Sequence, residues 1–357
     1  MIRKAKYKDF KDIQKIFEEG FTDEYKQRDI DIVQRIKKWQ QIYPIIKLLA
    51  TFNNPYQYLF NVHVYEDDEE KKVVGFIQTS ARSKDCTRWH IENIAVLPNQ
   101  RGKGIAKKLI NYIFDEYINK GVNRFTLEVD INNTPAIKLY ESLGFRKYTT
   151  IHYYKLLAKN LPEFKTDIIS IPKGFRKYKD SDAEKCLELY TSSTPSSIRI
   201  VDQKTLKDFQ NNTIEKVSKC LKEITRKSCD LSFVVEKDDK IIASLEIVAQ
   251  YRQLPHVIRL LVHPGYEDLN EQLLLYSFNI LNKYPQRTVL IAASEHQKGK
   301  INTLEKLKLK KISSDYLMVK DNFQLVKLSD TISDVVKDNG NLKPIFLNKE
   351  YAIRKNS

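Results

Sequence analysis

The stretch from Ile91 to Ala106 (IENIAVLPNQRGKGIA) constrains the fold more than any other part of the chain. A short apolar strand meets Pro98, a turn with Gly102 and Gly104 follows, and a helix begins directly after the turn. Glycine lets the backbone approach a ligand with no Cβ in the way, and the first turn of a helix presents unpaired N–H groups and a positive dipole end. The stretch therefore predicts a strand, a turn and a helix that together bind a phosphate group.

Two common phosphate-binding loops do not fit this turn. A dinucleotide-binding loop needs a third glycine where Lys107 stands, and a P-loop needs glycine, four residues and then Gly-Lys-Ser/Thr. The pattern that does fit is Arg/Gln-x-x-Gly-x-Gly/Ala, here with Arg101, Gly104 and Ala106. On this loop alone, an ordinary strand-to-helix turn with two glycines stays the alternative, because short motifs match by accident.

A second informative block, NNTPAIKLYESLGFRKY, occupies residues 132–148. Proline is tolerated in the first turn of a helix, and Gly144 ends it, so the block predicts a short helix before a strand that begins at Phe145. With Asn133 and Tyr140 at their spacing, this block resembles the second signature of the GNAT superfamily of N-acetyltransferases. The loop after Pro98 resembles the acetyl-CoA pyrophosphate loop of the same family. Two signatures in the right order are far more specific than either one, and the resemblance covers residues 1 to about 157.

The resemblance implies acetyl-CoA as a cosubstrate. The residues that it assigns to acetyl-CoA binding are Ile94, Ala95, Val96, Arg101, Gly102, Lys103, Gly104, Ile105, Ala106, Asn133 and Tyr140. In the family a backbone N–H of the preceding strand polarises the acetyl carbonyl, which places that donor near Ala95 or Val96. Asn133 is expected to hydrogen-bond the CoA arm, and its alternative role is a helix cap.

Acetyl transfer to an amine also needs a base for the ammonium and an acid for the departing thiolate. Glu92 and Glu128 are the candidate bases, because both lie on strands that the family places beside the acetyl group. Either one could instead be a strand-face residue in solvent or in an ion pair. Tyr140 is the candidate acid, because a phenol of pKa about 10 can protonate a thiolate at neutral pH. The alternative interpretation of Tyr140 is a core residue on the buried face of the helix.

The chain before and between the two blocks predicts an α/β (α+β) fold. Three apolar runs, at residues 58–65, 73–81 and 88–97, follow one another without an intervening helix and predict an antiparallel meander. A helix over residues 104–120 leads to a fourth strand at 124–131, which such a crossover makes parallel to its predecessor. Residues 2–20 predict a strand, a turn and a helix.

The chain after residue 174 repeats this order and predicts a second, degenerate copy. Aligned through Val96-x-Pro98 and Val262-x-Pro264, the loop positions Arg101, Gly104 and Ala106 become Glu267, Asn270 and Gln272. In the second block, Tyr140 becomes Leu304, Asn133 becomes Gln297 and Glu128 becomes Ala292. A glutamate would repel a pyrophosphate, so the second copy is expected to lack the chemistry and to pack against the first or shape its substrate groove. The rival interpretation is an unrelated domain.

These patterns divide the 357 residues into three parts. We expect a catalytic GNAT domain at 1–160, a degenerate GNAT-like domain at 161–330, each a mixed, mostly antiparallel sheet flanked by helices, and a tail at 331–357. The aromatic stretch from Phe21 to Phe60 has no family motif; it could wall a substrate cleft, although core packing is the preferred interpretation.

The composition limits which metal sites, disulfides and binding partners are expected. The four cysteines form no Cys-x-x-Cys pair and the histidines are dispersed, so no disulfide framework and no metal site is expected. No apolar run of membrane-spanning length and no signal pattern occurs, which favours a cytoplasmic protein. The net charge of +15 is spread along the chain. The sequence therefore predicts an acetyl-CoA-dependent N-acetyltransferase that acts on a primary amine. The alternative is a non-catalytic scaffold that contacts nucleic acid or protein.

Overall fold

The computed structural model describes residues 1–27, 31, 36–37, 40–41, 61–69, 71–83, 86–167, 171–211, 213–322, 325–326 and 352–353. The first half of the chain contains β1 (Ile2–Lys4), α1 (Phe10–Gln27), β2 (Asn61–Glu66), β3 (Val73–Ala81), β4 (Arg88–Val96), α3 (Ile105–Ile118), β5 (Arg124–Asp130), α4 (Thr134–Ser142) and β6 (Arg146–Leu156). Short 3₁₀ turns lie at Tyr7–Asp9, Pro98–Gln100 and Ala158–Phe164. The predicted elements of this half are confirmed in type and order, although α1 continues to Gln27, beyond the helix expected over residues 2–20.

The second half repeats the same order. Its elements are β7 (Phe175–Lys177), α5 (Ala183–Ser193), α6 (Ser196–Arg199), α7 (Leu206–Phe209), α8 (Thr213–Ile224), β8 (Ser228–Lys237), β9 (Lys240–Gln250), β10 (His256–Val262), α9 (Leu269–Leu281), β11 (Val289–Ser294), α10 (Lys298–Lys306) and β12 (Lys310–Asp321). Beyond it, β13 (Leu325–Val326) and β14 (Ala352–Ile353) form a separate antiparallel pair.

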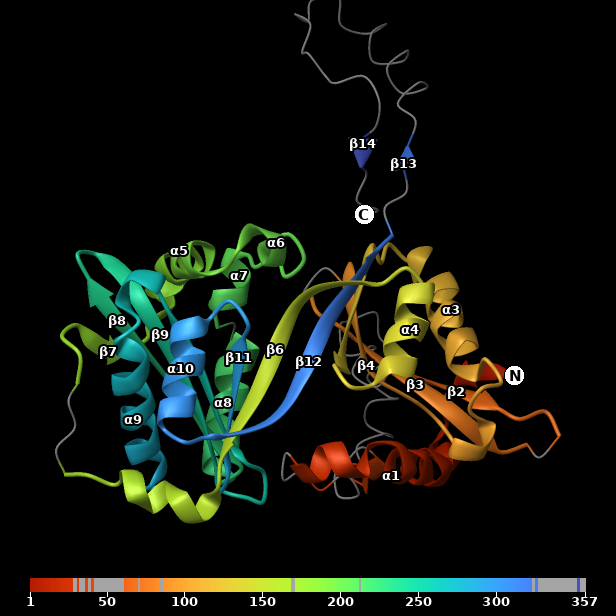
Figure 1. Cartoon of the computed structure of the whole chain (residues 1–357), viewed down its shortest axis with the longest axis horizontal. Coiled ribbons are helices and arrows are strands. Elements are labelled where there is room, and N and C mark those ends of the chain that lie inside the picture. Colours follow the sequence, from red (N-terminus) through yellow and green to blue (C-terminus); the bar gives the residue numbers. More distant parts are fainter. Residues whose placement is uncertain are drawn as a thin grey trace, which may run out of the picture.

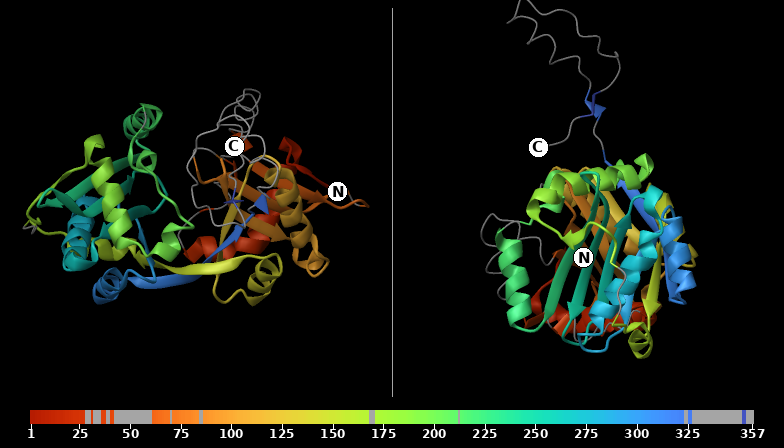
Figure 2. Two further views of the ribbon diagram at one scale, coloured as in Figure 1. Left: turned by 90° about the horizontal axis from the view of Figure 1, so that it is seen from above. Right: turned by 90° about the vertical axis from the view of Figure 1, so that its left-hand side faces the viewer.

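In the described part of the chain, the main sheet has twelve strands in the order β1-β2-β3-β4-β5-β12-β6-β11-β10-β9-β8-β7. Strand β12 of the second copy pairs with β5 of the first, and β6 of the first pairs with β11 of the second. In Figures 1 and 2, β6 and β12 run side by side between the two halves. The copies thus exchange their last strands, so each half-sheet ends on a strand that the other copy supplies.

Strand directions follow the predicted meander and crossover. Strands β2, β3 and β4 are antiparallel neighbours, and β5, reached through α3, is parallel to β4. The predicted apolar face of α1 is buried, with Ile13, Ile16 and Phe17 each at most 2% exposed. Separate buried clusters lie under α3 in the first half and under α9 in the second, as expected of a repeat in which each helix covers its own half-sheet.

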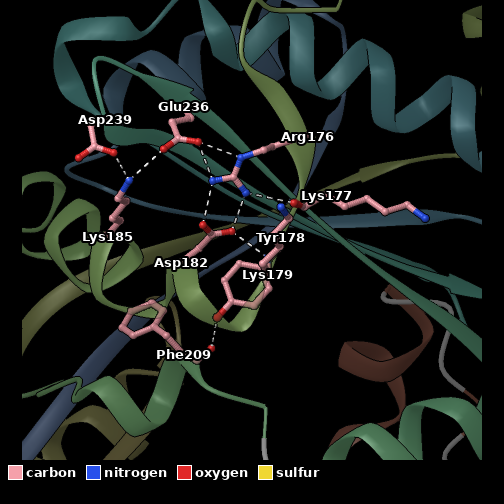
Figure 3. A network of polar contacts seen from close by, with 9 residues as sticks. All are labelled: Arg176, Lys177, Tyr178, Lys179, Asp182, Lys185, Phe209, Glu236 and Asp239. Carbon is pink, nitrogen blue, oxygen red and sulfur yellow. Dashed lines mark hydrogen bonds and ion pairs between the residues drawn. The ribbon is translucent and has the colours of Figure 1, made fainter.

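A polar network occurs twice and marks the repeat. Arg3 donates to both oxygens of Asp9, at 2.6 and 2.9 Å, and to Glu66 at 2.9 Å. In the second copy, Arg176 donates to both oxygens of Asp182, at 2.7 and 2.8 Å, and to Glu236 at 2.9 Å (Figure 3). Such bidentate pairs have a specific geometry, so their recurrence at matching positions supports two related domains.

Arg124 joins the two copies at the exchanged strands. Its side chain is 9% exposed, and its Nε donates to Asp321 Oδ1 at 2.5 Å. Its Nη1 donates to the carbonyl oxygens of Ile200 and Val201 at 2.5 and 3.0 Å, at the end of α6. A buried guanidinium is stable only when its donors are paired, so this contact ties β5 to the second copy.

Two expectations lie largely outside the described residues. They are the aromatic stretch from Phe21 to Phe60, except for its first residues, and most of the tail after 322. Among the helices that the structure describes, none is both long enough and apolar enough to cross a membrane.

Candidate functional site

A cavity of about 850 Å³ opens where β4 and β5 diverge. The two strands pair from Arg88 with Arg124 to Ile91 with Leu127, and beyond that point both continue unpaired to each other. The cavity lies along this gap and extends to the turn before α3 and to the first turn of α4. A parallel pair that separates in this way leaves backbone groups and side chains of both strands facing a ligand.

Strand β4 has an irregularity at the mouth of the gap. Its pairing with β3 shifts by one residue between Asn93, opposite Gln78, and Ile91, opposite Thr79. Glu92 is therefore the extra residue of a β-bulge, a feature that redirects side chains and often occurs beside active sites.

The turn before α3 has the backbone conformation that its glycines predict. Gly102 and Gly104 have φ values of +79° and +74°, and a Cβ at either position would meet no atom within 4 Å. The space in front of the turn is thus open to a ligand. Arg101 donates from Nε to the carbonyl of Val96 at 3.2 Å, which holds its side chain at the end of β4. The N–H groups at the start of α3 complete a site suited to phosphate.

Asn133 and Tyr140 border the cavity from α4. Asn133 is the N-cap of this helix, since its Oδ1 accepts from the N–H of Ala136 at 3.2 Å. A carboxamide can cap with its oxygen and still donate from its nitrogen to a ligand. Tyr140 is 6% exposed, and burial raises the pKa of its hydroxyl to about 12. The phenol is therefore protonated at neutral pH, and within the described residues no hydrogen-bond partner of its hydroxyl is found.

The two candidate bases have different neighbours. Glu92 accepts hydrogen bonds on its Oε1 from Ser80 and, at 3.0 Å, from Arg82, so an ion pair already engages it. Glu128 accepts from the hydroxyl of Tyr153, on β6, at 2.6 Å through Oε2. For the other oxygen of Glu128, the described part of the chain shows no partner. Glu128 is the better placed of the two to accept a proton.

Most of the predicted site residues meet in this cavity. Those that line it are Glu92, Ile94, Ala95, Val96, Arg101, Gly102, Gly104, Ile105, Ala106, Glu128, Asn133 and Tyr140. Lys103 does not line it; its ammonium donates to Gln100 Oε1 at 2.7 Å. Among the residues that the structure describes, no cluster of His, Cys, Asp and Glu suits a metal.

Sequence reasoning missed several polar residues that line the cavity, among them Arg82, His90, Asp130 and Asp315. His90, on β4, is one of the histidines that are dispersed along the sequence. It is 8% exposed, its Nδ1 lies 2.8 Å from Thr126 Oγ1, and burial lowers its pKa to about 3, so the imidazole is neutral. Asp315 belongs to β12, far away in the sequence, and no local pattern could have placed it beside β5. Phe21, from the aromatic stretch, also lines the cavity.

The equivalent gap in the second copy is filled by the chain itself. Strands β10 and β11 pair only from His256 to Ile258, as β4 and β5 do at their start, but Lys300 enters beyond that point. Its side chain is 5% exposed, and its Nζ donates to the carbonyl of Leu260 at 2.9 Å. In the alignment above, Lys300 replaces Ala136 of the first copy.

The phosphate turn is also replaced. Helix α9 begins at Leu269 without a glycine turn, and the carboxyl group of Glu267 lies against the first turn of α10. A Cβ on Gly299 would be 2.5 Å from Glu267 Cδ. The pairing of β10 with β9 has no bulge. Among the described residues, the second copy therefore keeps the scaffold, whereas Lys300 occupies the equivalent gap and no glycine of positive φ stands at the start of α9.

Comparison with known proteins agrees with this division. Residues 10–145 match the model of the Acetyltransferase (GNAT) family. The [Ribosomal protein bS18]-alanine N-acetyltransferase of Escherichia coli K12 is 42% identical over 83 residues, which are 23% of this chain and 54% of that protein. The chain thus spans about half the length of the curated relatives that it matches.

Solved structures extend the likeness of the fold to both copies. A GCN5-related N-acetyltransferase from Sphaerobacter thermophilus aligns with a TM-score of 0.59 at 13% identity, over 90% of this chain and 95% of that one. A tandem GNAT protein from the clavulanic acid biosynthesis pathway aligns with a TM-score of 0.51 at 13% identity, over 74% and 83%. At such identities the comparison concerns architecture alone.

Proposed function

Because the chain belongs to the GNAT acetyltransferases through residues 10–145, with a second GNAT-like copy after them, we propose that it is an acetyl-CoA-dependent N-acetyltransferase whose active site is the cavity of the first copy. The observation that carries the proposal is that one cavity gathers the glycine turn, Asn133 and Tyr140. A scaffold without catalysis has no need for these three features together.

The residues present fit acetyl-CoA. The open space before Gly102 and Gly104, the N-terminus of α3 and the side chains of Arg101 and Lys107 suit a pyrophosphate. The gap between β4 and β5 suits an extended arm that hydrogen-bonds to strand backbone. When bound, acetyl-CoA supplies the thioester whose acetyl group moves to the amine.

Each catalytic requirement has a residue at the cavity. Glu128 accepts the proton of the acceptor ammonium, directly or through water, because its carboxylate borders the cavity and has an oxygen available. The neutral amine then attacks the thioester directly. A backbone N–H near Ala95 stabilises the negative charge on the carbonyl oxygen. As the C–S bond breaks, Tyr140 donates its phenolic proton to the thiolate sulfur, and the proton that the nitrogen loses as the amide forms restores the phenol. The positive end of α3 holds the cosubstrate in place throughout.

The test of the proposal is a titration of the full chain with acetyl-CoA, followed by thiol detection with a panel of primary amines. We expect one acetyl-CoA per chain, a melting temperature that rises with ligand concentration, and release of free thiol only when an amine is present. No binding of acetyl-CoA or CoA would refute the proposal, and two sites per chain would refute its assignment to the first copy.

A further inference from the structure

Helix α8 of the second copy has its apolar side in solvent. Val217, Leu221 and Ile224 follow one another at helical spacing and form one stripe along the helix, with Cys220 beside them. The three apolar side chains are each more than half exposed, and Cys220 is exposed as well. We refer to these four residues as the outer stripe.

The polar side of α8 faces the rest of the protein. Lys219 donates to Asn211 Oδ1 at 2.7 Å, and the Nζ of Lys222 lies 3.9 Å from Asp230 Oδ2 on β8. At about 3.6 residues per turn, both lysines lie on the side of the helix opposite the outer stripe. A surface helix ordinarily turns its apolar side to the core, so the orientation of α8 is the reverse of the usual one.

A helix in this orientation needs a partner. Helix α8 has 12 residues, and isolated helices shorter than about 12–15 residues are marginal in water unless an apolar face is packed. The outer stripe belongs to none of the buried hydrophobic clusters in the described part of the chain. Contiguous apolar side chains on a protein surface mark an interaction site, so the outer stripe is suited to an interface.

The borders of the outer stripe show which kind of partner fits. One border has both Lys216 and Glu223, seven residues or about two turns apart. The other border has Ser218 and, directly after the helix, Thr225, which are uncharged. A lipid surface or a nucleic acid is anionic and would be matched by cations alone. A border with one charge of each sign is instead complementary to itself.

Self-complementarity requires the two helices to run antiparallel. With a two-fold axis between positions 220 and 221, the partner's Glu223 lies opposite position 218, which is about 3 Å along the helix from Lys216. The symmetry forms this ion pair twice. Lys216 also pairs with Asp180 at 2.5 Å, and the three donors of an ammonium group can serve both carboxylates.

We propose that the outer stripe is the surface through which two copies of this chain associate, with their α8 helices packed antiparallel and Lys216 of each paired with the partner's Glu223. The interface belongs to the second copy and does not depend on the acetyl transfer proposed above.

The first test is the oligomeric state of the full chain, measured by sedimentation velocity over the micromolar range. We expect a dimer in reversible equilibrium with the monomer, because an interface formed mainly by one helix pair is small. Leu221→Lys should weaken association at least about tenfold, since it places an ammonium in the apolar seam. Leu275→Lys, at an exposed leucine of α9, is the matched control and should associate as wild type does.

Charge reversal tests the antiparallel arrangement. Lys216→Glu and Glu223→Lys should each weaken association about tenfold, because each turns two attractive pairs into repulsive ones. The double variant Lys216→Glu/Glu223→Lys restores opposite charges across the interface and should associate within about threefold of wild type. Asp180→Asn removes the pair within the chain and should leave association unchanged.

Cross-linking locates the interface. Bismaleimidoethane joins two thiols across a short spacer, so it should convert wild type into a covalent dimer through Cys220, which lies beside the two-fold axis. Cys220→Ser and Leu221→Lys should both prevent this product, since one removes the thiol and the other the association.

Several outcomes would overturn the inference. They are a chain that stays monomeric throughout the micromolar range, a dimer that Leu221→Lys leaves intact, and a double variant that associates no better than the single ones. A monomer whose melting temperature falls in Leu221→Lys but not in Leu275→Lys would also overturn it, because the chain itself would then cover the outer stripe. Binding of acetyl-CoA should be equal in wild type and Leu221→Lys, so the proposed function is tested separately.

Discussion

The two copies have the same strand gap and use it in opposite ways. In the first copy the gap between β4 and β5 is open, and a glycine turn and Tyr140 border it. In the second copy Lys300 fills the gap, and a leucine stands where Tyr140 would be. A fold of this kind does not by itself make a binding site, because a few side chains decide whether its gap is open or closed.

The contrast between an open and a filled gap is tested most directly at the hydroxyl group of Tyr140. Tyr140→Phe should lower kcat about a thousandfold, because the thiolate would leave without its proton donor. The dissociation constant of acetyl-CoA should change little, since the ring still packs in the core. Stopped-flow thiol detection and calorimetry measure the two quantities. Tyr276→Phe, in the core of the second copy, is the matched control, and an equal loss of kcat in that variant would remove the distinction between the copies.

Among the charged side chains at the junction between the copies, Arg124 should contribute most to the free energy of unfolding. Arg124→Ala should lower the free energy of unfolding by about 3 kcal/mol, because Asp321 Oδ1 and the carbonyl groups of Ile200 and Val201 lose the donors that Arg124 provides. Arg146 pairs with the same Asp321 at 3.2 Å but is 58% exposed, so Arg146→Ala should cost less than about 1 kcal/mol. Urea unfolding measures both, and similar losses would contradict a junction held by the buried guanidinium.

Lys300 predicts a pH dependence that belongs to the second copy alone. Burial lowers its pKa to about 8, so between about pH 8 and its ordinary pKa the unfolded chain binds more protons than the folded one. The free energy of unfolding that this group contributes therefore rises with pH through that window, by about 3 kcal/mol in all. Lys300→Met should abolish this rise in the free energy of unfolding. The variant should exceed wild type in stability most clearly near pH 7, where the buried ammonium costs most.

Urea unfolding at pH 7 and pH 10 measures this dependence. Lys283→Met, at an exposed lysine of the same copy, is the control and should follow wild type. If the free energy of unfolding of Lys300→Met depended on pH as that of wild type does, the ammonium would not be desolvated in the gap between β10 and β11.

The smallest effect is expected from glycine substitutions in the turn before α3 of the first copy and in the turn before α9 of the second copy. Gly104 has a φ of +74°, so Gly104→Ala should cost about 1–2 kcal/mol of stability and raise the dissociation constant of acetyl-CoA. At the equivalent turn, a Cβ on Gly265 would lie 3.4 Å from His263 Nδ1, an ordinary contact. Gly265→Ala should therefore change stability by less than about 0.5 kcal/mol and leave acetyl-CoA binding unchanged. Equal effects on binding would show that the first turn has no special role.

Much of the candidate site was predictable because its signals are local. The glycine turn, the cap at Asn133 and the position of Tyr140 each depend on residues within one strand, turn and helix, where spacing alone determines which groups share a face. The loss of these groups in the second copy was visible for the same reason. Lys300 was not recognised, because a lysine on a short helix is ordinarily solvated and only burial reveals its place in the gap.

The sequence by itself determined the order of elements, the duplication, and which copy carries the polar groups of the cavity. Periodic apolar patterns and the backbone preferences of glycine and proline act over a few residues and need no distant partner. Only the tertiary structure decided that β6 and β12 change places and that Asp315 enters the cavity of the other copy. Any edge strand with alternating side chains can accept several neighbours, and the choice among them depends on the free energy of the whole sheet.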